Sequence, residues 1–201
     1  MLDKGSSQYR AVVIGVSMGG VEALRVLLPG LPKDFPLPIL IVHHISPDAG
    51  SGLATMLDQL CVIRVKEAEE GEHLASGTAY LAPPNYHVLV EKNGTLALSV
   101  DMPVNFARPS VDVLFESAAE AFGPALIGVI LTGAGSDGSR GLRSIKDKGG
   151  LAIVQDPDDA AADLMPRSAL AAVKADYILP LREMARLFCV LTDYESSTTT
   201  A

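Results

Sequence analysis

Four segments of the chain consist almost entirely of apolar residues, without the alternation of a half-exposed strand. They span residues 11–16, 39–42, 125–132 and 150–156. Strands that are apolar on both sides are typical of a parallel sheet covered by helices on both faces. We therefore predict that these four segments are buried strands.

Other segments place apolar residues three and four positions apart, which is the spacing of one helix face. Between 109 and 123, for example, Val111, Leu114, Phe115 and Ala118 fall on one stripe. The same spacing predicts helices over residues 21–31, 52–60, 109–123, 139–150, 167–173 and 181–194.

The middle of the chain has a different pattern, in which apolar and polar residues alternate. It covers 62–68, 77–83 and 87–100, and Asn93-Gly94 divides the last of these. Asn-Gly between alternating runs is a strong signal for a type I′ hairpin. We predict a β-rich excursion with one solvated side, and we expect His73 and His87 to lie on its surface.

Together these patterns predict an α/β fold: a doubly wound, mainly parallel sheet flanked by helices, with a β-hairpin excursion in the middle. A length of 201 residues fits one domain, which we assign to residues 1–195, with 196–201 as a disordered tail. Apolar residues make up 48% of the chain and aromatic residues only 5%, so the core must be aliphatic.

Charge and apolar run lengths narrow the classes of partner. The formal net charge of -8 argues against nucleic acid and against docking on an anionic membrane. No apolar run is long enough to span a bilayer, so we expect no membrane insertion. Cys61 and Cys189 lack metal-ligand spacing and indicate buried thiols in a reducing, cytoplasmic setting.

Three polar groups follow the predicted strands. Ser17 comes after the first, His43 and His44 end the second, and Asp137 follows the third. In such a sheet, ligands bind at the carboxyl ends of the strands. A hydroxyl, an imidazole and a carboxylate brought together there are the set that acyl transfer by a serine nucleophile requires.

Each of these residues also has a simpler interpretation. Ser17 and Asp137 each precede a predicted helix, where either residue type is a common N-cap. In favour of a nucleophile, Gly15-Val16-Ser17-Met18-Gly19 matches the G-x-S-x-G pattern of a sharp turn. His43 and His44 point to opposite sides of a strand, so only one can serve Ser17, and the pair is a poor metal site.

A competing motif runs from Gly133 to Gly138, whose sequence GAGSDG reads as G-x-G-x-x-G between a strand and a helix. Such a loop can hold a pyrophosphate, and Asp156 and Asp158 lie where a ribose-binding acid belongs. Alternatively, its backbone amides serve as donors to an oxyanion. A nucleotide-binding domain is therefore an alternative at this point.

Several longer motifs resemble the catalytic domain of the CheB protein-glutamate methylesterases. They are IGVSMGG, IVHHIS, VKEAEEGEHLASGTAYLAPPNYH, RPSVDVLF, GVILTGAGSDG and LMPRSA, and the likeness runs from about residue 11 to 185. The resemblance implies a serine esterase that hydrolyses glutamate γ-methyl esters of bacterial chemoreceptors and releases methanol. Glutamine deamidation is a second activity in many members, and no metal or cofactor is implied.

Carried over by position, the resemblance makes Ser17 the nucleophile, His44 the general base and Asp137 its orienting carboxylate. It assigns the oxyanion donors to the backbone amides of Met18 and Ala134. It also places the segment Met165-Pro166-Arg167 at the substrate cleft.

The chain departs from the family pattern at three positions within these motifs. Met18 stands where Thr is common, Ala134 where Met is usual, and Ser136 where Asn is usual. Met18 and Ala134, together with the absence of the family's usual receiver domain, leave open the alternative of a CheB-like interaction module with weak or no catalysis.

The resemblance also implies partners. The first is the methylated cytoplasmic domain of a chemoreceptor. Family members usually carry a receiver domain before the catalytic domain, whereas this chain begins about ten residues before its first strand. Three alternatives stay open: a stand-alone esterase, a partner of a separate receiver domain or kinase, or a fragment of a longer protein. We expect a cytoplasmic monomer.

Overall fold

A computed structural model describes residues 8–44 and 52–193 of the chain. The predicted tail, 196–201, lies outside the described residues. Cys61 and Cys189 are free thiols. We predicted that both are buried, but each is only half-buried. Within the two described ranges, no helix is long and apolar enough to cross a membrane.

Seven parallel strands form the central sheet, in the order β3-β4-β2-β1-β7-β8-β9. The predicted doubly wound parallel sheet is therefore confirmed. The strands are β1 (Ala11–Val16), β2 (Ile39–His43), β3 (Arg64–Glu67), β4 (Thr78–Leu81), β7 (Leu126–Ile130), β8 (Leu151–Gln155) and β9 (Tyr177–Leu179).

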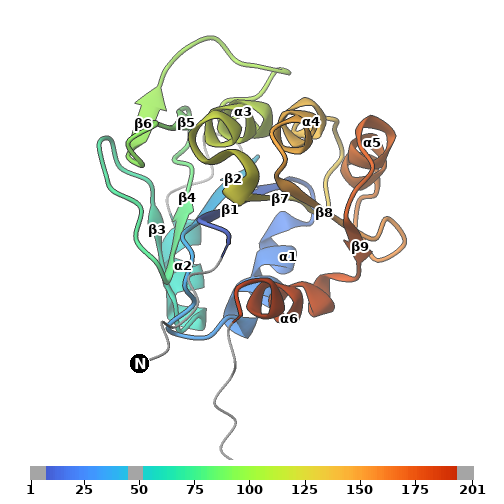
Figure 1. Cartoon of the computed structure of the whole chain (residues 1–201), viewed down its shortest axis with the longest axis horizontal. Helices are drawn as coiled ribbons and strands as arrows, with labels where there is room; N and C mark the ends of the chain where they lie inside the picture. Colours follow the sequence, from blue (N-terminus) through green and yellow to red (C-terminus); the bar gives the residue numbers. More distant parts are fainter. Residues whose placement is uncertain (1–7, 45–51, 194–201) are drawn as a thin grey trace, which may run out of the picture.

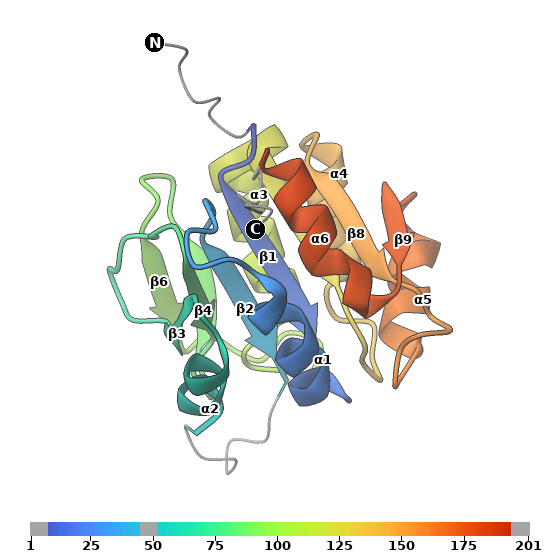
Figure 2. The ribbon, with the colours of Figure 1, turned by 90° about the horizontal axis from the view of Figure 1, so that it is seen from below.

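α-Helices cover both faces of this sheet (Figure 1). They are α1 (Gly20–Leu27), α2 (Gly52–Leu60), α3 (Val111–Phe122), α4 (Ser139–Asp147), α5 (Leu164–Ala172) and α6 (Leu181–Leu191), with short 3₁₀ turns η1 (Leu28–Gly30) and η2 (Gly123–Ala125). Figure 2 looks onto the face that carries α1, α2 and α6, and α3, α4 and α5 lie on the other face.

The apolar core is divided between these two faces because successive side chains of a strand point to opposite sides. In β1, Val12 and Ile14 pack with residues of α1 and α6, such as Leu24 and Phe188. Val13 packs in the other half of the core, with residues of α3 and α4. All six residues of β1 are buried, which explains why this strand is apolar without interruption.

The middle of the chain differs from the prediction. Both β3 and β4 belong to the main sheet, and β4 is buried along its whole length, so these segments are not part of an excursion. Within the part of the chain that the structure describes, β5 (His87–Val90) and β6 (Leu96–Ser99) are the strands that form a separate antiparallel hairpin. His87 is buried, contrary to our prediction, whereas His73 is exposed as expected.

The hairpin turn is not of the predicted type I′, which needs a positive φ at both central residues. Of Asn93 and Gly94, only Gly94 has a positive φ, of 83°. The Gly94 N–H donates to the carbonyl of Glu91 at 2.9 Å, and the Asn93 side chain accepts from the Thr95 N–H. The asparagine therefore stabilises the turn through its side chain.

Strand order determines where the polar residues that follow the strands lie. β1 is the central strand, with β2 on one side and β7 on the other. The Ser17 N–H donates to the carbonyl of Thr132 at 3.0 Å, and the His44 N–H donates to that of Val16 at 3.1 Å. The residues after β1, β2 and β7 thus share one edge of the sheet.

Helices α3 and α4 pack closely at Gly141, and this contact generates a stability prediction. A β-carbon at Gly141 would lie 2.5 Å from Cβ of Phe115 and 3.1 Å from Cα of Asp112. Gly141→Ala must therefore push the helices apart, and we expect it to lower the free energy of unfolding by about 1–3 kcal/mol. Urea unfolding measures this change.

Gly52→Ala is the matched control, because no described atom lies within 4 Å of a β-carbon at that helical position. Equal unfolding free energies for the two variants would contradict the close α3–α4 contact.

Candidate active site

Ser17 lies on a sharp turn between β1 and α1. Its carbonyl accepts from the Gly20 N–H at 2.8 Å, and Gly19 adopts the left-handed conformation with a φ of 78°. The N-cap of α1 is Gly19, and no side chain of residues 8–44 or 52–193 caps the helix. The interpretation of Ser17 as a helix cap is therefore wrong, and its hydroxyl is not used for capping.

The turn that carries Ser17 depends on a close backbone approach from the segment after β7. A β-carbon at Gly133 would lie only 3.0 Å from Cβ of Ser17 and would overlap the sulfur of Met165. Glycine lets this segment pass between the two side chains. The first glycine of the GAGSDG motif is thus needed for packing beside Ser17.

The two adjacent histidines have different surroundings. His43, the last residue of β2, is buried, and its Nε2–H donates to the carbonyl of Ser17 at 3.2 Å. Burial lowers the pKa of His43, which favours the neutral ring. The side chain of His44 is 23% exposed, and its Nε2 lies 2.8 Å from Oδ2 of Asp137. Only His44 meets the predicted carboxylate.

Asp137 is almost fully buried and accepts several hydrogen bonds. Besides His44, Oδ2 accepts from the Val111 N–H at 2.7 Å. Oδ1 accepts from Oγ of Ser110 (2.9 Å), Nδ2 of Asn105 (3.0 Å) and the N–H groups of Asp112 (3.2 Å) and Gly138 (3.1 Å). Asp137 therefore caps the N-terminus of α3 while it holds His44.

This capping differs from the predicted one. We predicted that Asp137, if it were a cap, would cap the helix that follows it, but the N-cap of α4 is Gly138. Asp137 instead caps α3, which begins 26 residues earlier in the chain.

These hydrogen bonds determine the charge state of Asp137. Burial on its own raises the pKa of the carboxyl group. The hydrogen bonds from His44, from Asn105 and from the Val111 N–H outweigh burial and bring the pKa down to about 2. Asp137 is therefore an anion at neutral pH, as the partner of a catalytic imidazole must be.

The geometry of the GAGSDG segment argues against a phosphate site. The N–H groups of Gly138 and Gly141 donate to Oδ1 of Asp112 at 2.9 and 2.7 Å, and the Ser139 N–H donates to the carbonyl of Ser136. A dinucleotide would need free amides at this helix N-terminus. A protein carboxylate already occupies them, so the nucleotide-binding alternative is not favoured.

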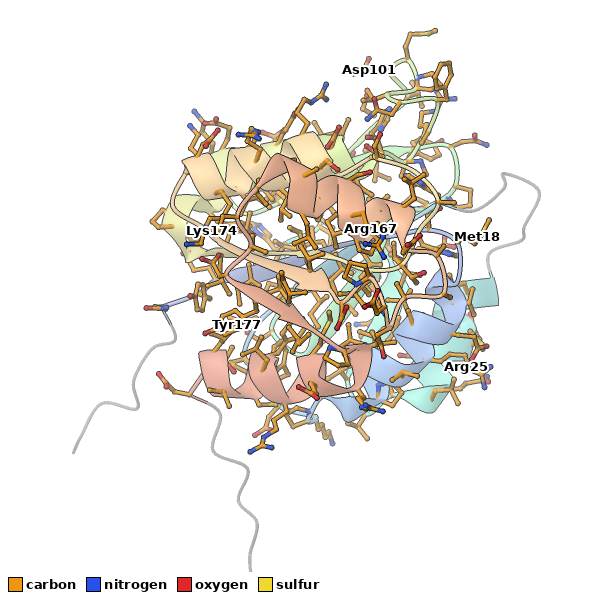
Figure 3. All side chains as sticks on the ribbon, turned by 90° about the vertical axis from the view of Figure 1, so that its right-hand side faces the viewer. Met18, Arg25, Asp101, Arg167, Lys174 and Tyr177 are labelled. Carbon is orange, nitrogen blue, oxygen red and sulfur yellow. The ribbon has the colours of Figure 1, made fainter. Side chains whose placement is uncertain are left out.

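The predicted oxyanion donors are the backbone amides of Met18 and Ala134. Neither N–H donates to an acceptor among residues 8–44 and 52–193. The side chain of Met18 is 61% exposed and points outward at the edge of the molecule (Figure 3), and its carbonyl accepts from Oγ1 of Thr132. Both amides are thus available to a ligand.

Ser17, His44 and Asp137 open onto one hollow of about 740 Å³. The same hollow is lined by Asn85, Pro103, Asn105, Phe106, Ala107, Arg108, Pro109, Ala134, Gly135 and Ser136. No hydrogen bond joins Oγ of Ser17 to His44 in the described structure. Catalytic hydrogen bonds often tighten only when substrate is bound, so this does not argue against the pair.

A loop between β6 and α3 forms one side of this hollow. Residues 100–110 arch away from the sheet after β6 (Figure 1), and Asp101 marks this loop in Figure 3. Phe106 is fully exposed on it. Sequence reasoning missed these lining residues, although the RPSVDVLF motif begins within the loop at Arg108.

The segment Met165-Pro166-Arg167 does not line the hollow. Met165 and Pro166 are buried in α5, and the Met165 N–H donates to the carbonyl of Gly133 at 2.9 Å. Arg167 is exposed (Figure 3) and pairs with Asp163 at 2.6 Å. Through its bond to Gly133, this segment supports the loop that lies beside Ser17.

The low pKa of Asp137 predicts a specific acid sensitivity. A carboxyl group with a pKa of about 2 when folded and 3.8 when unfolded stabilises the protein fully above about pH 4. That stabilisation, about 2 kcal/mol, is lost as pH falls toward 2. Between pH 6 and pH 2.5, which is still above the folded pKa, we expect the wild type to lose about 1.5 kcal/mol more unfolding free energy than Asp137→Asn.

Urea unfolding at intervals across this range makes the comparison. If the unfolding free energies of the two proteins differed by the same amount at every pH, Asp137 would not be an anion stabilised by these hydrogen bonds.

Comparison with known proteins gives a consistent picture. The family model described as CheB methylesterase matches residues 12–188. A relative from Leptospira interrogans, provisionally named protein-glutamate methylesterase/protein-glutamine glutaminase, is 54% identical over 180 residues, which cover 90% of this chain and 93% of the relative.

A protein-glutamate methylesterase/protein-glutamine glutaminase from Nitrosomonas europaea is 44% identical over 90% of this chain, which spans about half (51%) of that relative. Among solved structures, the CheB methylesterase catalytic domain of Thermotoga maritima matches with a TM-score of 0.88 and 38% identity. The match covers 91% of this chain and 98% of that domain.

Proposed function

The chain belongs to the CheB methylesterase family, and we propose that Ser17, His44 and Asp137 are the catalytic triad with which it hydrolyses glutamate γ-methyl esters. The observation that carries this assignment is the 2.8 Å bond between His44 and Asp137, at the hollow onto which Ser17 opens. A bound anion on one side of the ring and a hydroxyl on the other are what a serine esterase needs.

The hydrogen bond to Asp137 determines which ring nitrogen acts as base. Nε2 of His44 donates to the carboxylate, so the proton sits on Nε2 and Nδ1 carries the free electron pair. Nδ1 takes the proton from Oγ of Ser17 as this oxygen attacks the ester carbonyl. Asp137 then stabilises the imidazolium that forms.

The negative charge that develops on the carbonyl oxygen needs donors in place before the reaction. In our proposal the N–H groups of Met18 and Ala134 supply them. A backbone amide does not depend on the side chain, so Met18 and Ala134 can act even though they differ from the family pattern.

The tetrahedral intermediate collapses when the ester C–O bond breaks. His44 returns its proton to the leaving oxygen, and methanol departs. Water, activated by the same Nδ1, then attacks the acyl-enzyme and releases a glutamate carboxylate and free Ser17. With a glutamine side chain the same steps release ammonia, which is the second activity named for the relatives.

The substrate in this proposal is a methylated side chain in the cytoplasmic domain of a chemoreceptor, so the enzyme works in the cytoplasm. An ester on a protein reaches Ser17 only if the entrance is open to a second polypeptide. The exposed rim at Phe106 and the wide hollow support such a substrate. A separate receiver domain or kinase remains a candidate regulator.

Removal of the nucleophile gives the first test. We expect Ser17→Ala to lower methanol release from a methylated receptor fragment by at least about 10³-fold, with the unfolding free energy little changed. Ser136→Ala is the matched control, because this serine lines the same hollow and is exposed.

A fluorophosphonate should label Ser17 in the wild type, and mass spectrometry of the labelled peptide identifies the site. Undiminished methanol release by Ser17→Ala would end the proposal. Receptor binding without methanol release by the wild type would favour the interaction-module alternative instead.

The two adjacent histidines give a second test. His44→Gln removes the base, and we expect it to lower kcat by about 10²–10⁴-fold. His43→Gln keeps an N–H donor for the Ser17 carbonyl, so its effect should be much smaller. Steady-state methanol release by both variants decides which histidine is the base. A larger loss of kcat in His43→Gln than in His44→Gln would assign the base to His43.

A further inference from the structure

Asn105 connects two buried carboxylates beside the proposed triad. Its Nδ2 donates to Oδ2 of Asp112 at 2.9 Å and to Oδ1 of Asp137 at 3.0 Å, so both of its N–H bonds are used. Asn105 lies in the loop 100–110, is itself exposed, and has a positive φ of 51°. No motif in the sequence singled it out.

The two carboxylates lie close enough to repel each other. Asp112 and Asp137 are both at most 4% exposed, and both accept from the Gly138 N–H, at 2.9 and 3.1 Å. The charged and titratable groups that face the pair are His44, which bonds to Asp137, and Arg140, whose Nε lies 3.7 Å from Oδ2 of Asp112. Between the two anions, Asn105 places a neutral donor that bonds to both.

We propose that Asn105 is a positioning residue for the esterase reaction: its amide holds the Asp137 carboxylate in the orientation that directs Oδ2 at His44. Asn105 does not contact the reacting atoms. Oδ1 also accepts from Oγ of Ser110 and from the N–H groups of Asp112 and Gly138, and the Asn105 amide completes this set of donors, which limits the rotation of Oδ2. The inference rests on the proposed triad and adds a residue to it.

The loop that carries Asn105 is held in place by other bonds, so this amide is not needed to anchor it. Nε2–H of His87 donates to the carbonyl of Met102, and Nη1 of Arg108 donates to that of Val100 at 2.7 Å. The N–H groups of Val104 and Ala107 each donate to the other residue's carbonyl, at 3.1 and 2.9 Å. The side chain of Asn105 therefore serves the carboxylates rather than the loop.

Two substitutions separate the amide from the backbone conformation. Asn105→Gly removes the amide and tolerates the positive φ, whereas Asn105→Ala removes the amide and also strains the backbone. We expect both to lower kcat for methanol release by about 10–100-fold, with KM changed less than about threefold, because a misplaced catalytic group costs up to about 10²-fold. The rate of fluorophosphonate labelling of Ser17 should fall in parallel.

Asn105→Asp adds a readout that a purely structural role would not move. It is nearly isosteric but brings a third carboxylate next to Asp137, which favours the protonated form of His44. The acid limb of the pH profile of kcat/KM should therefore move to higher pH. If Asn105→Gly failed to fold, which circular dichroism would reveal, this variant would carry the test.

Asn85→Gly is the matched control. Asn85 also lines the hollow and has a positive φ of 65°, but its side chain makes no hydrogen bond within the described ranges. Any effect of this substitution should fall on KM rather than on kcat.

The inference would be overturned if Asn105→Gly and Asn105→Asp both kept the kcat, the labelling rate and the pH profile of the wild type. That result is distinct from failure of the proposed function, which would show as methanol release by Ser17→Ala. The labelling rate tests Asn105 even where no receptor substrate is turned over.

Discussion

The structure around the site depends on two buried carboxylates that cap each other's helices. Asp112, in the first turn of α3, accepts from the N-terminal amides of α4, and Asp137, just before α4, accepts from those of α3. Each anion lies where a helix dipole favours negative charge, which offsets part of the cost of burying it. The same exchange aligns α3 with α4 and places a carboxylate beside His44.

Much of the fold follows from local patterns in the sequence. The continuous apolar runs predicted β1, β2, β7 and β8, because strands buried on both sides carry few polar residues. The alternating pattern of β3 and β4 indicated half-exposed strands, yet both pair in the parallel sheet. Edge strand β9 is only three residues long and mostly exposed, so it gave no periodic signal.

The site shows the same division between local and non-local information. Strand-end reasoning selected Ser17, Asp137 and the pair His43 and His44, and the family resemblance then chose His44. Ser17, His44 and Asp137 do line one hollow, while their catalytic roles stay a prediction. The sequence could not separate capping from chemistry, because one residue type suits both. Asp137 caps a helix remote in sequence, and Asn105 acts from an irregular loop, so neither arrangement leaves a local pattern.

The strand order has a consequence for how the site is spanned. Ser17 follows the central strand, His44 the strand on one side, and Asp137 the strand on the other. The His44–Asp137 hydrogen bond therefore joins segments that follow the two strands on either side of β1. His44 makes this contact through Nε2, the ring nitrogen farther from its backbone. Because the two partners come from opposite sides of β1, the same contact that prepares His44 also ties together the loops that enclose Ser17.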